Sequence, residues 1–251
     1  MQINGSIVLV TGANRGLGRA FARGLLERGA TTVYGGARDP GTIVDPGVIP
    51  VALDITDPMS VAAAVARCGD VTILVNNAGI GGGGALLGAP GTDGAREEME
   101  VNYFGTLAMC RAFAPVLRRN GGGALVNMLS ALSFFSLPDL GSYSASKSAA
   151  WSLTNGVRIE LRSQGTQVVG IHAGFIDTDL TATLEVPKAD PVDIVHKALD
   201  GVEAGWEEVL ADDTSVAVKA ALPHDLDHLY PGIQRQWDDA HREAFPASAA
   251  R

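Results

Sequence analysis

Tyr143 and Lys147 stand four residues apart in the segment GSYSASKS, residues 141–148. Residues at i and i+4 share one face of a helix, so a helix here would bring a phenol and an ammonium group together. Free tyrosine has a pKa of about 10, and a nearby cation favours the phenolate. The spacing therefore predicts either a polar surface pair or an acid, Tyr143, whose pKa is lowered by the charge of Lys147.

A glycine-rich turn, TGANRGLG at residues 11–18, links an apolar run to a helical pattern through Gly12, Gly16 and Gly18. Glycines allow a tight turn and close approach of a pyrophosphate, and the helix that follows offers unpaired N–H groups. The spacing is G-x-x-x-G-x-G rather than G-x-G-x-x-G, and no Lys-Ser/Thr pair follows it as in a P-loop. The turn predicts a dinucleotide site.

The residues after the second apolar run favour NADP(H) over NAD(H). An NAD site places an acid there to accept from the ribose 2′-OH, but this chain has Gly36 and Ala37, followed by Arg38. Arg38 and Arg15 could converge on a 2′-phosphate. Asp39 keeps NAD(H) as the alternative.

Together, the motifs TGANRGLG, NNAG (residues 76–79) and YSASK (residues 143–147) resemble those of the classical short-chain dehydrogenase/reductase (SDR) family. The resemblance runs from about residue 5 to about residue 212. It implies an oxidoreductase that reduces a ketone or aldehyde with NADP(H), or runs the reverse reaction, and that assembles as a homodimer or homotetramer. A cytoplasmic location is expected separately, because the sequence shows no signal-peptide pattern and no apolar run of membrane length.

The resemblance also implies four catalytic residues. Tyr143 is the proton donor, Lys147 binds the nicotinamide ribose as well as tuning Tyr143, and Ser130 orients the substrate oxygen. Asn102, in EVNYFG, orders a water for proton relay. Ser133 is a weaker candidate for the serine.

The implied cofactor contacts are spread along the chain. Asp54 would meet the adenine amino group, although it could instead cap a helix, and Ile176 and Thr178 would meet the nicotinamide carboxamide. Ala173 replaces the family's usual proline in HAGFIDT, which predicts a somewhat less rigid loop. The full predicted set is Gly12, Asn14, Arg15, Gly16, Leu17, Gly18, Arg38, Asp54, Ile55, Asn77, Ala78, Gly79, Tyr143, Lys147, Gly174, Ile176 and Thr178.

Alternating apolar runs and helical patterns must position these residues. Strands are expected at 6–11, 31–35, 48–53, 71–76, 124–129, 166–172 and 206–211, with helices near 16–29, 58–67, 92–119, 140–164 and 190–205. Strands that are apolar almost throughout suit burial on both faces. The order predicts a Rossmann-like, doubly wound parallel sheet of about seven strands in a three-layer α/β/α arrangement. We expect one domain over 1–251, with a core at about 5–212 and a C-terminal helix and tail at 213–251.

Composition narrows the function further. A net charge of −9 disfavours nucleic acid and anionic membranes as partners. The N-terminus does not resemble a signal peptide, and no apolar run reaches the roughly 18 residues of a membrane span. Cys68 and Cys110 are expected in the core of a reduced protein. His224 and His228 have no evident third ligand, so no metal is expected.

Smaller segments carry weaker expectations. The charged run REEME (residues 96–100) is interpreted as a solvated face, the glycine-rich segment 80–91 as a mobile loop, and residues 244–251 as frayed. Phe134, Phe135 and Leu137 are placed near the mouth of the site, which favours a small or medium apolar carbonyl substrate. A cofactor-sensing protein without turnover is the non-enzymatic alternative, and the complete catalytic set argues against it.

Overall fold

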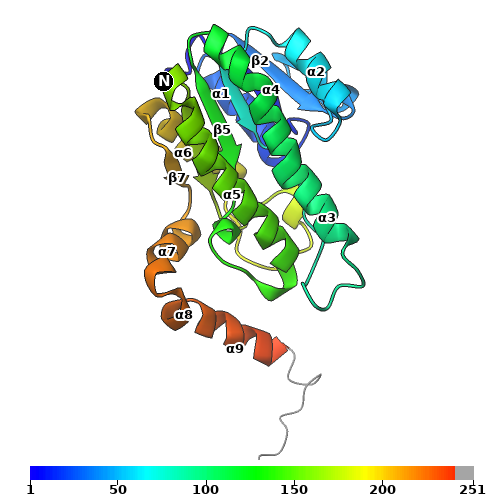
Figure 1. Ribbon diagram of the computed structural model, residues 1–251, viewed down its shortest axis with the longest axis vertical. Helices are drawn as coiled ribbons and strands as arrows, with labels where there is room; N and C mark the ends of the chain where they lie inside the picture. The colour runs from blue at the N-terminus through cyan, green and yellow to red at the C-terminus, as the bar shows by residue number, and fades with distance from the viewer. Residues whose placement is uncertain (241–251) are drawn as a thin grey trace, which may run out of the picture.

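The computed structural model describes residues 1–240, and within them the chain forms a seven-stranded parallel sheet of order β3-β2-β1-β4-β5-β6-β7 (Figure 1). The strands are β1 (Ile7–Thr11), β2 (Thr32–Ala37), β3 (Val48–Ala52), β4 (Ile73–Asn76), β5 (Ala124–Met128), β6 (Gln167–His172) and β7 (Glu208–Leu210). All seven predicted strands are confirmed, with ends shifted by one or two residues. The predicted Rossmann-like, three-layer class is therefore correct.

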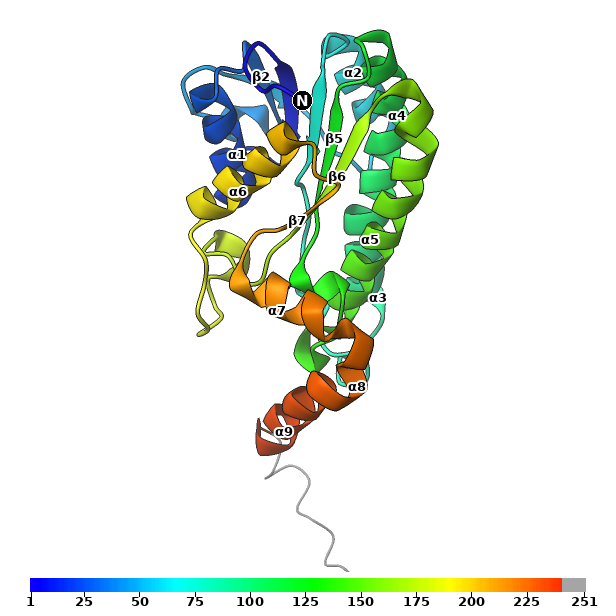
Figure 2. The ribbon, with the colours of Figure 1, turned by 90° about the vertical axis from the view of Figure 1, so that its left-hand side faces the viewer.

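Helices cover both faces of the sheet (Figure 2). One face carries α1 (Gly16–Glu27) and α6 (Pro191–Ala204), which pack on each other. The other carries α2 (Pro58–Arg67), α4 (Thr106–Arg119) and α5 (Gly141–Leu161). Asp57 and Asp190 cap α2 and α6 by accepting from backbone N–H groups, and each is followed by a proline at the first helical position.

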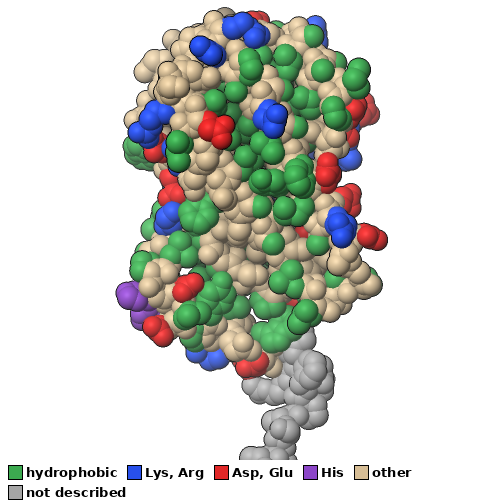
Figure 3. Space-filling model, viewed as in Figure 1, with side chains coloured by type: hydrophobic (Ala, Val, Ile, Leu, Met, Phe, Trp, Pro, Cys, Tyr) green, Lys and Arg blue, Asp and Glu red, His purple; other side chains and the backbone are tan. Residues whose placement is uncertain are grey.

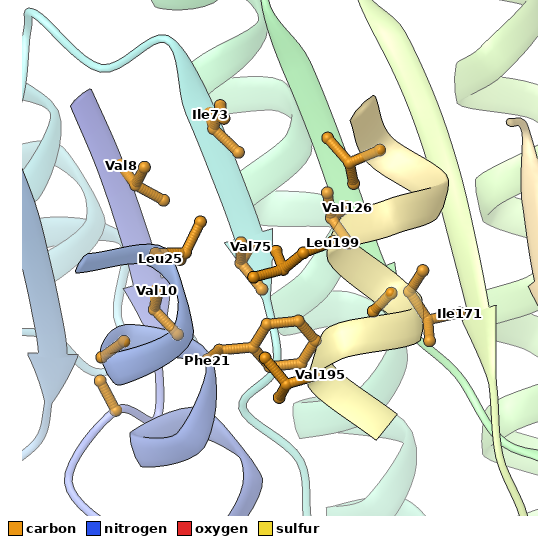
Figure 4. Packing of buried hydrophobic residues seen from close by; sticks show 14 of the residues in the cluster. Val8, Val10, Phe21, Leu25, Ile73, Val75, Val126, Ile171, Val195 and Leu199 are labelled. Carbon is orange, nitrogen blue, oxygen red and sulfur yellow. The ribbon is translucent and has the colours of Figure 1, made fainter. Parts of the chain in front are cut away.

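The core lies between the sheet and these helix layers. On the α1 and α6 side, Phe21 projects between the two helices onto the valines of β1 and β4 (Figure 4). Phe21 and Leu25 are fully buried. Burying an aromatic or leucine side chain stabilises the fold by about 1.5–3 kcal/mol. This packing holds the start of α1, and hence the glycine turn, against the end of β1.

The strand order reverses between β1 and β4, whose chain continuations leave in opposite directions across the sheet. In open α/β sheets a ligand crevice forms outside the carboxyl ends of the strands at such a switch point. The glycine turn follows β1 and the NNAG segment ends β4, so both border this crevice.

The predicted helix at 92–119 is interrupted. The chain forms α3 (Asp93–Met99), a π-helical segment at Glu100–Gly105, and then α4. Asn102 lies inside the π-helical segment, a type of local widening that is frequent at functional sites. Sequence periodicity over 92–119 does not distinguish this widening from a regular helix.

The C-terminal part contains more helix than predicted. After β7 come α7 (Asp213–Ala221), α8 (Asp225–His228) and α9 (Tyr230–Ala240), which extend away from the sheet (Figures 1 and 2). The tail expected at residues 244–251 lies outside the described residues.

Candidate active site

The glycine turn packs so tightly against its neighbours that its glycines have no room for side chains. Gly12 and Gly16 have positive φ angles of 66° and 50°, a region that disfavours other residues. A Cβ on Gly18 would lie 2.1 Å from the Gly12 carbonyl oxygen and 2.5 Å from Asn77 Nδ2. Asn77 donates from Nδ2 to the Thr11 carbonyl at 3.0 Å, which ties the turn to the end of β4. With no side chains at these positions, a ligand can approach the backbone of the turn directly.

The N-terminus of α1 suits an anion. Its cap residue, Arg15, makes no side-chain cap hydrogen bond, and the first turn contains no acidic residue. Unpaired N–H groups and the positive end of the helix dipole at such a terminus favour phosphate. The glycines and the uncapped helix therefore fit the pyrophosphate of a dinucleotide.

At the other end of the crevice, Arg38 is exposed beside the cleft, next to Asp54. Hydrogen bonds from the Thr56 hydroxyl and backbone N–H lower the pKa of Asp54 against the opposing effect of burial, and the charge of Arg38 lowers it further. Arg15 does not converge on Arg38: its Nη1 lies 3.7 Å from Asp179 Oδ2, and both side chains are largely exposed. Asp57, not Asp54, caps α2.

Tyr143 and Lys147 lie on one face of α5, as predicted, with Lys147 Nζ 5.7 Å from the centre of the Tyr143 ring. The predicted direction of the Tyr143 pKa is wrong for the chain alone. Burial raises the pKa of Tyr143 to about 12; a side-chain hydrogen bond with Ser130 opposes the rise, and the charge of Glu98 adds to it. Burial also lowers the pKa of Lys147 to about 8, which weakens it as a cation. Desolvation outweighs the attraction that the i, i+4 spacing suggests.

Ser130 reaches the cleft from the end of β5. Its Oγ accepts from Leu132 N at 3.1 Å and donates to the Ala173 carbonyl at 3.5 Å, and its hydroxyl opposes the rise in the pKa of Tyr143. Ser133 Oγ accepts from Ser130 N at 3.2 Å and does not line the cleft. The geometry therefore places Ser130, and not its neighbour, beside the phenol.

Asn102 lies behind the cleft rather than in its wall, and is 1% exposed. Its Oδ1 accepts from Ile80 N and its Nδ2 donates to the Ile80 carbonyl, both at 2.9 Å. A Cβ on Gly79 would lie 3.0 Å from Asn102 Oδ1 and 3.5 Å from Lys147 Nζ. The asparagine amide and the lysine ammonium group therefore flank the same stretch of backbone.

The charged run at 96–100 is not uniformly solvated, because Glu98 is 1% exposed. Its Oε1 accepts from Gly83 N at 2.9 Å, while its Oε2 has no hydrogen-bond partner among the described residues. Ser142 Oγ donates to the Gly84 carbonyl at 3.2 Å. These two side chains clamp the base of loop 80–91 beside Tyr143. Every third or fourth residue of a surface helix faces inward, so only the helix phase could have identified Glu98 from sequence.

The substrate-facing part of the cleft is apolar. Phe135, Leu137, Leu140, Phe175, Leu180 and Leu184 line it. Phe134, predicted near the mouth, instead stacks on His172 with ring centres 4.1 Å apart, and it does not line the cleft. Neighbouring side chains that follow the short turn Ala131–Ser133 point in different directions. The apolar run FFSL does not by itself indicate which of its two phenylalanines faces the cleft.

The predicted residues converge on one cleft of about 940 Å³. Every predicted cofactor-binding residue lines it, and so do three of the four predicted catalytic residues, Ser130, Tyr143 and Lys147. Cys68 and Cys110 are buried, as predicted. Among the described residues, no helix is both long and apolar enough to cross a membrane.

Comparison with protein families matches residues 6–188 to the family described as short chain dehydrogenase. The chain therefore belongs to the short-chain dehydrogenase/reductase family, and it is an oxidoreductase of that class.

Known relatives agree with this assignment. A short chain dehydrogenase of Monascus purpureus is 34% identical over 79% of this chain and 75% of its own length. A crystal structure of a short chain dehydrogenase from Burkholderia cenocepacia in complex with NADP is 42% identical, with a TM-score of 0.89, over 93% of this chain and 99% of the other. A 3-ketoacyl-(acyl-carrier-protein) reductase from Brucella melitensis complexed with NADH is 26% identical, with a TM-score of 0.75, over 82% and 96% of the two chains.

Proposed function

We propose that this protein is an NADP(H)-dependent reductase that converts a ketone or aldehyde into an alcohol, reversibly. The observation that carries the proposal is the meeting, in one cleft, of the glycine turn with Ser130, Tyr143 and Lys147. The bound nucleotide would supply or accept the hydride, and the chain supplies position and electrostatics.

Residues from both halves of the chain would hold the nucleotide. The turn at Gly12–Gly18 and the uncapped α1 receive the pyrophosphate. Asp54 and Ile55 receive the adenine, while Ile176 and Thr178 receive the carboxamide end. The cleft runs continuously between these two groups of residues, which supports this placement.

The choice of NADP(H) over NAD(H) depends on Arg38. No acidic side chain stands at Gly36 or Ala37, and the exposed guanidinium of Arg38 matches a phosphate dianion. NADP in the Burkholderia relative supports this choice, and NADH in the Brucella reductase keeps NAD(H) as the alternative. Arg15 can join Arg38 only by leaving Asp179, a contact that costs little because both groups are exposed.

Tyr143 is the proposed proton donor in the reducing direction. Its raised pKa keeps the phenol protonated at neutral pH, so the group is present as an acid, and transfer to the substrate oxygen can occur as that oxygen gains charge. Ser130, which lines the same cleft as the phenol, would donate to the same oxygen and stabilise it. Lys147 and Asn102 would return a proton to Tyr143 from solvent.

The substrate proposed is small or medium-sized and apolar at the carbonyl-bearing end. The side chains around Tyr143 in the outer cleft are leucines and phenylalanines, and Leu180 lies across from the phenol ring beside Gly81. Such walls exclude water and offer no ionic partner for a charged group near the carbonyl.

The decisive experiment is a panel of ketones and aldehydes assayed by loss of NADPH absorbance, in parallel with NADH. The proposal expects turnover of at least one apolar carbonyl, with NADPH preferred. Specific binding of NADPH without turnover by any carbonyl or alcohol would instead favour the cofactor-sensing alternative.

Assembly into a homodimer or homotetramer and a cytoplasmic location complete the proposal. Hydrophobic side chains are exposed on the face that carries α4 and α5 (Figure 3). Phe104 is 50% exposed and Ile159 76% exposed, and burial of such side chains favours association. Light scattering coupled to size-exclusion chromatography would give the number of subunits.

A further inference from the structure

We propose that His172 is a positioning residue for Ser130: its ring donates from Nδ1 to the Ser130 carbonyl and so fixes the backbone that carries the Ser130 hydroxyl. His172 is the last residue of β6 and is fully buried, and its Nδ1 lies 3.0 Å from that carbonyl oxygen. The inference rests on the proposed function of Ser130.

The peptide between Ser130 and Ala131 is held at both of its polar ends. His172 Nδ1 donates to the carbonyl of Ser130, and the backbone N–H of Ala131 donates to the Ala173 carbonyl at 2.7 Å. Adjacent residues of one strand end thus fix both groups of the peptide plane. The ψ angle of Ser130 is thereby constrained at 158°, which holds in place the backbone from which Oγ projects.

The His172 ring itself is locked by its neighbours. Phe134 stacks on it, with ring centres 4.1 Å apart and planes 21° apart. Trp151 packs edge-on against both rings. Trp151 stands on α5 at the i+8 position from Tyr143 and the i+4 position from Lys147, hence on the same helix face. The aromatic cluster Phe134–Trp151–His172 therefore connects the serine with the helix that carries the phenol.

The chemistry of the ring fixes which nitrogen carries the proton. Burial lowers the pKa of His172 to about 4, so the ring is neutral at neutral pH and carries one proton. A carbonyl oxygen can only accept, so that proton is on Nδ1. Nε2 has no hydrogen-bond partner among the described residues, and Glu208 Oε1 lies 3.6 Å from it. Lys219 pairs with Glu208 at 2.9 Å, and Arg158 acts on His172 through its charge alone.

The arrangement predicts how substitutions at residue 172 act. His172→Leu removes the donor, while His172→Asn keeps an N–H group near the place of Nδ1. Because the defect arises through Ser130, we expect His172→Leu to lower kcat about tenfold with little change in the KM for NADPH, whereas His172→Asn recovers most of the loss.

The test is a double-mutant cycle with Ser130→Ala. If His172 acts through the Ser130 hydroxyl, His172→Leu should change kcat less than twofold in the Ser130→Ala background. An equal tenfold loss in both backgrounds, no loss in the wild-type background, or no recovery by His172→Asn would each overturn the inference. Full activity of Ser130→Ala itself would instead overturn the proposed role of the serine. Thr154→Val, at a fully buried position elsewhere on α5, removes a hydroxyl that accepts from Asn127 Nδ2; it controls for the loss of a buried hydrogen bond and should leave kcat unchanged.

A second measurement does not require the variants to be active. Nitrogen-15 NMR of the wild-type protein labelled at its five histidines should show one ring protonated at Nδ1, bare at Nε2 and unchanged between about pH 5.5 and 8.5. The His172→Asn spectrum assigns that signal by its loss. A proton on Nε2 would overturn the inference, because Nδ1 would then have nothing to donate.

Discussion

The two halves of the cleft differ in the chemical groups that line them. The half next to β1, β2 and β4 presents backbone and exposed charge: glycines that a Cβ would block, an uncapped helix end and the solvent-facing Arg38. The half next to β5, β6 and the segment after β6 presents buried ionisable side chains and apolar walls. A nucleotide of constant structure can be bound by a fixed backbone, whereas a substrate that varies within the family is met by side chains.

The ionisable side chains of the two halves also differ in their exposure to water. Arg38 and Arg15, in the half next to β1, β2 and β4, are exposed to water. Tyr143, Lys147 and His172 are desolvated, and burial is the first cause of each of their pKa shifts. The substrate half therefore has ionisation states that depend on the fold, and we expect its variants to alter chemistry more than binding.

The largest expected effect is on the substrate half. Tyr143→Phe removes the proposed proton donor and should lower kcat for carbonyl reduction by about 10²–10⁴-fold. NADPH affinity, measured by fluorescence titration, should stay within a fewfold of wild type because the glycine turn is untouched. Tyr103→Phe, a hydroxyl removed outside the cleft, is the matched control and should retain full kcat. Unchanged ketone reduction by Tyr143→Phe would refute the proposed chemistry.

The nucleotide half should respond in the opposite way. Arg38→Ala removes a charge-assisted contact to a 2′-phosphate and should weaken NADPH binding by about 10–100-fold, since hydrogen bonds to charged groups contribute about 1.5–3 kcal/mol. NADH binding should not change, and kcat at saturating NADPH should be nearly preserved. Arg111→Ala, an exposed arginine away from the cleft, controls for net charge. Equal losses of affinity for NADPH and NADH would mean that Arg38 does not contact the 2′-phosphate.

The apolar wall gives a smaller effect. Leu180 is 53% exposed on the loop after β6 and approaches Gly81 beside the Tyr143 ring. Because its outer part is already in water, Leu180→Ala should leave the melting temperature nearly unchanged. The KM for an apolar carbonyl should rise about fivefold from the lost apolar contact, with the KM for NADPH constant. Leu226→Ala, 76% exposed on α8, is the control. A rise confined to NADPH would place Leu180 on the nucleotide side instead.

The same contrast explains what could be predicted from the sequence. The strands and the glycine turn follow local rules, so their residues were identified together with their roles in the backbone. Tyr143 and Lys147 were correctly placed on one helix face, but the direction of the Tyr143 pKa was wrong because burial is a property of the packed structure. Glu98 and Phe134 were misplaced for a related reason: the direction of a side chain in a short helix or turn depends on what packs against it.

His172 was not identified as a site residue from sequence because its significance lies in contacts with residues 21 to 47 positions away. Its partners come from four separate elements or turns: Ser130 and Phe134 flank the short turn Ala131–Ser133, and Trp151, Glu208 and Lys219 lie on α5, β7 and α7. A histidine at the end of an apolar strand looks like any core residue. Only the sheet register and the stack on Phe134 show that its ring faces the serine backbone.

The smallest expected effect concerns stability in acid. The folded chain holds His172 neutral with a pKa of about 4, against 6.5 when unfolded. Between these values the unfolded state binds more protons, so this residue lowers the free energy of unfolding as pH falls from 6.5 toward 4. Between pH 7.0 and 5.5 the loss should be on the order of 1 kcal/mol, since one pKa unit corresponds to about 1.4 kcal/mol.

His172→Asn isolates that contribution, because asparagine keeps a donor but does not titrate. Urea unfolding at both pH values should give a smaller acid-dependent loss for the variant than for wild type, by about 1 kcal/mol. His196→Asn, at an exposed histidine on α6, should follow the wild type. If wild type and His172→Asn lose the same stability on acidification, His172 is protonated in the folded chain. The desolvation that distinguishes the substrate half from the nucleotide half would then not extend to the strand end behind Ser130.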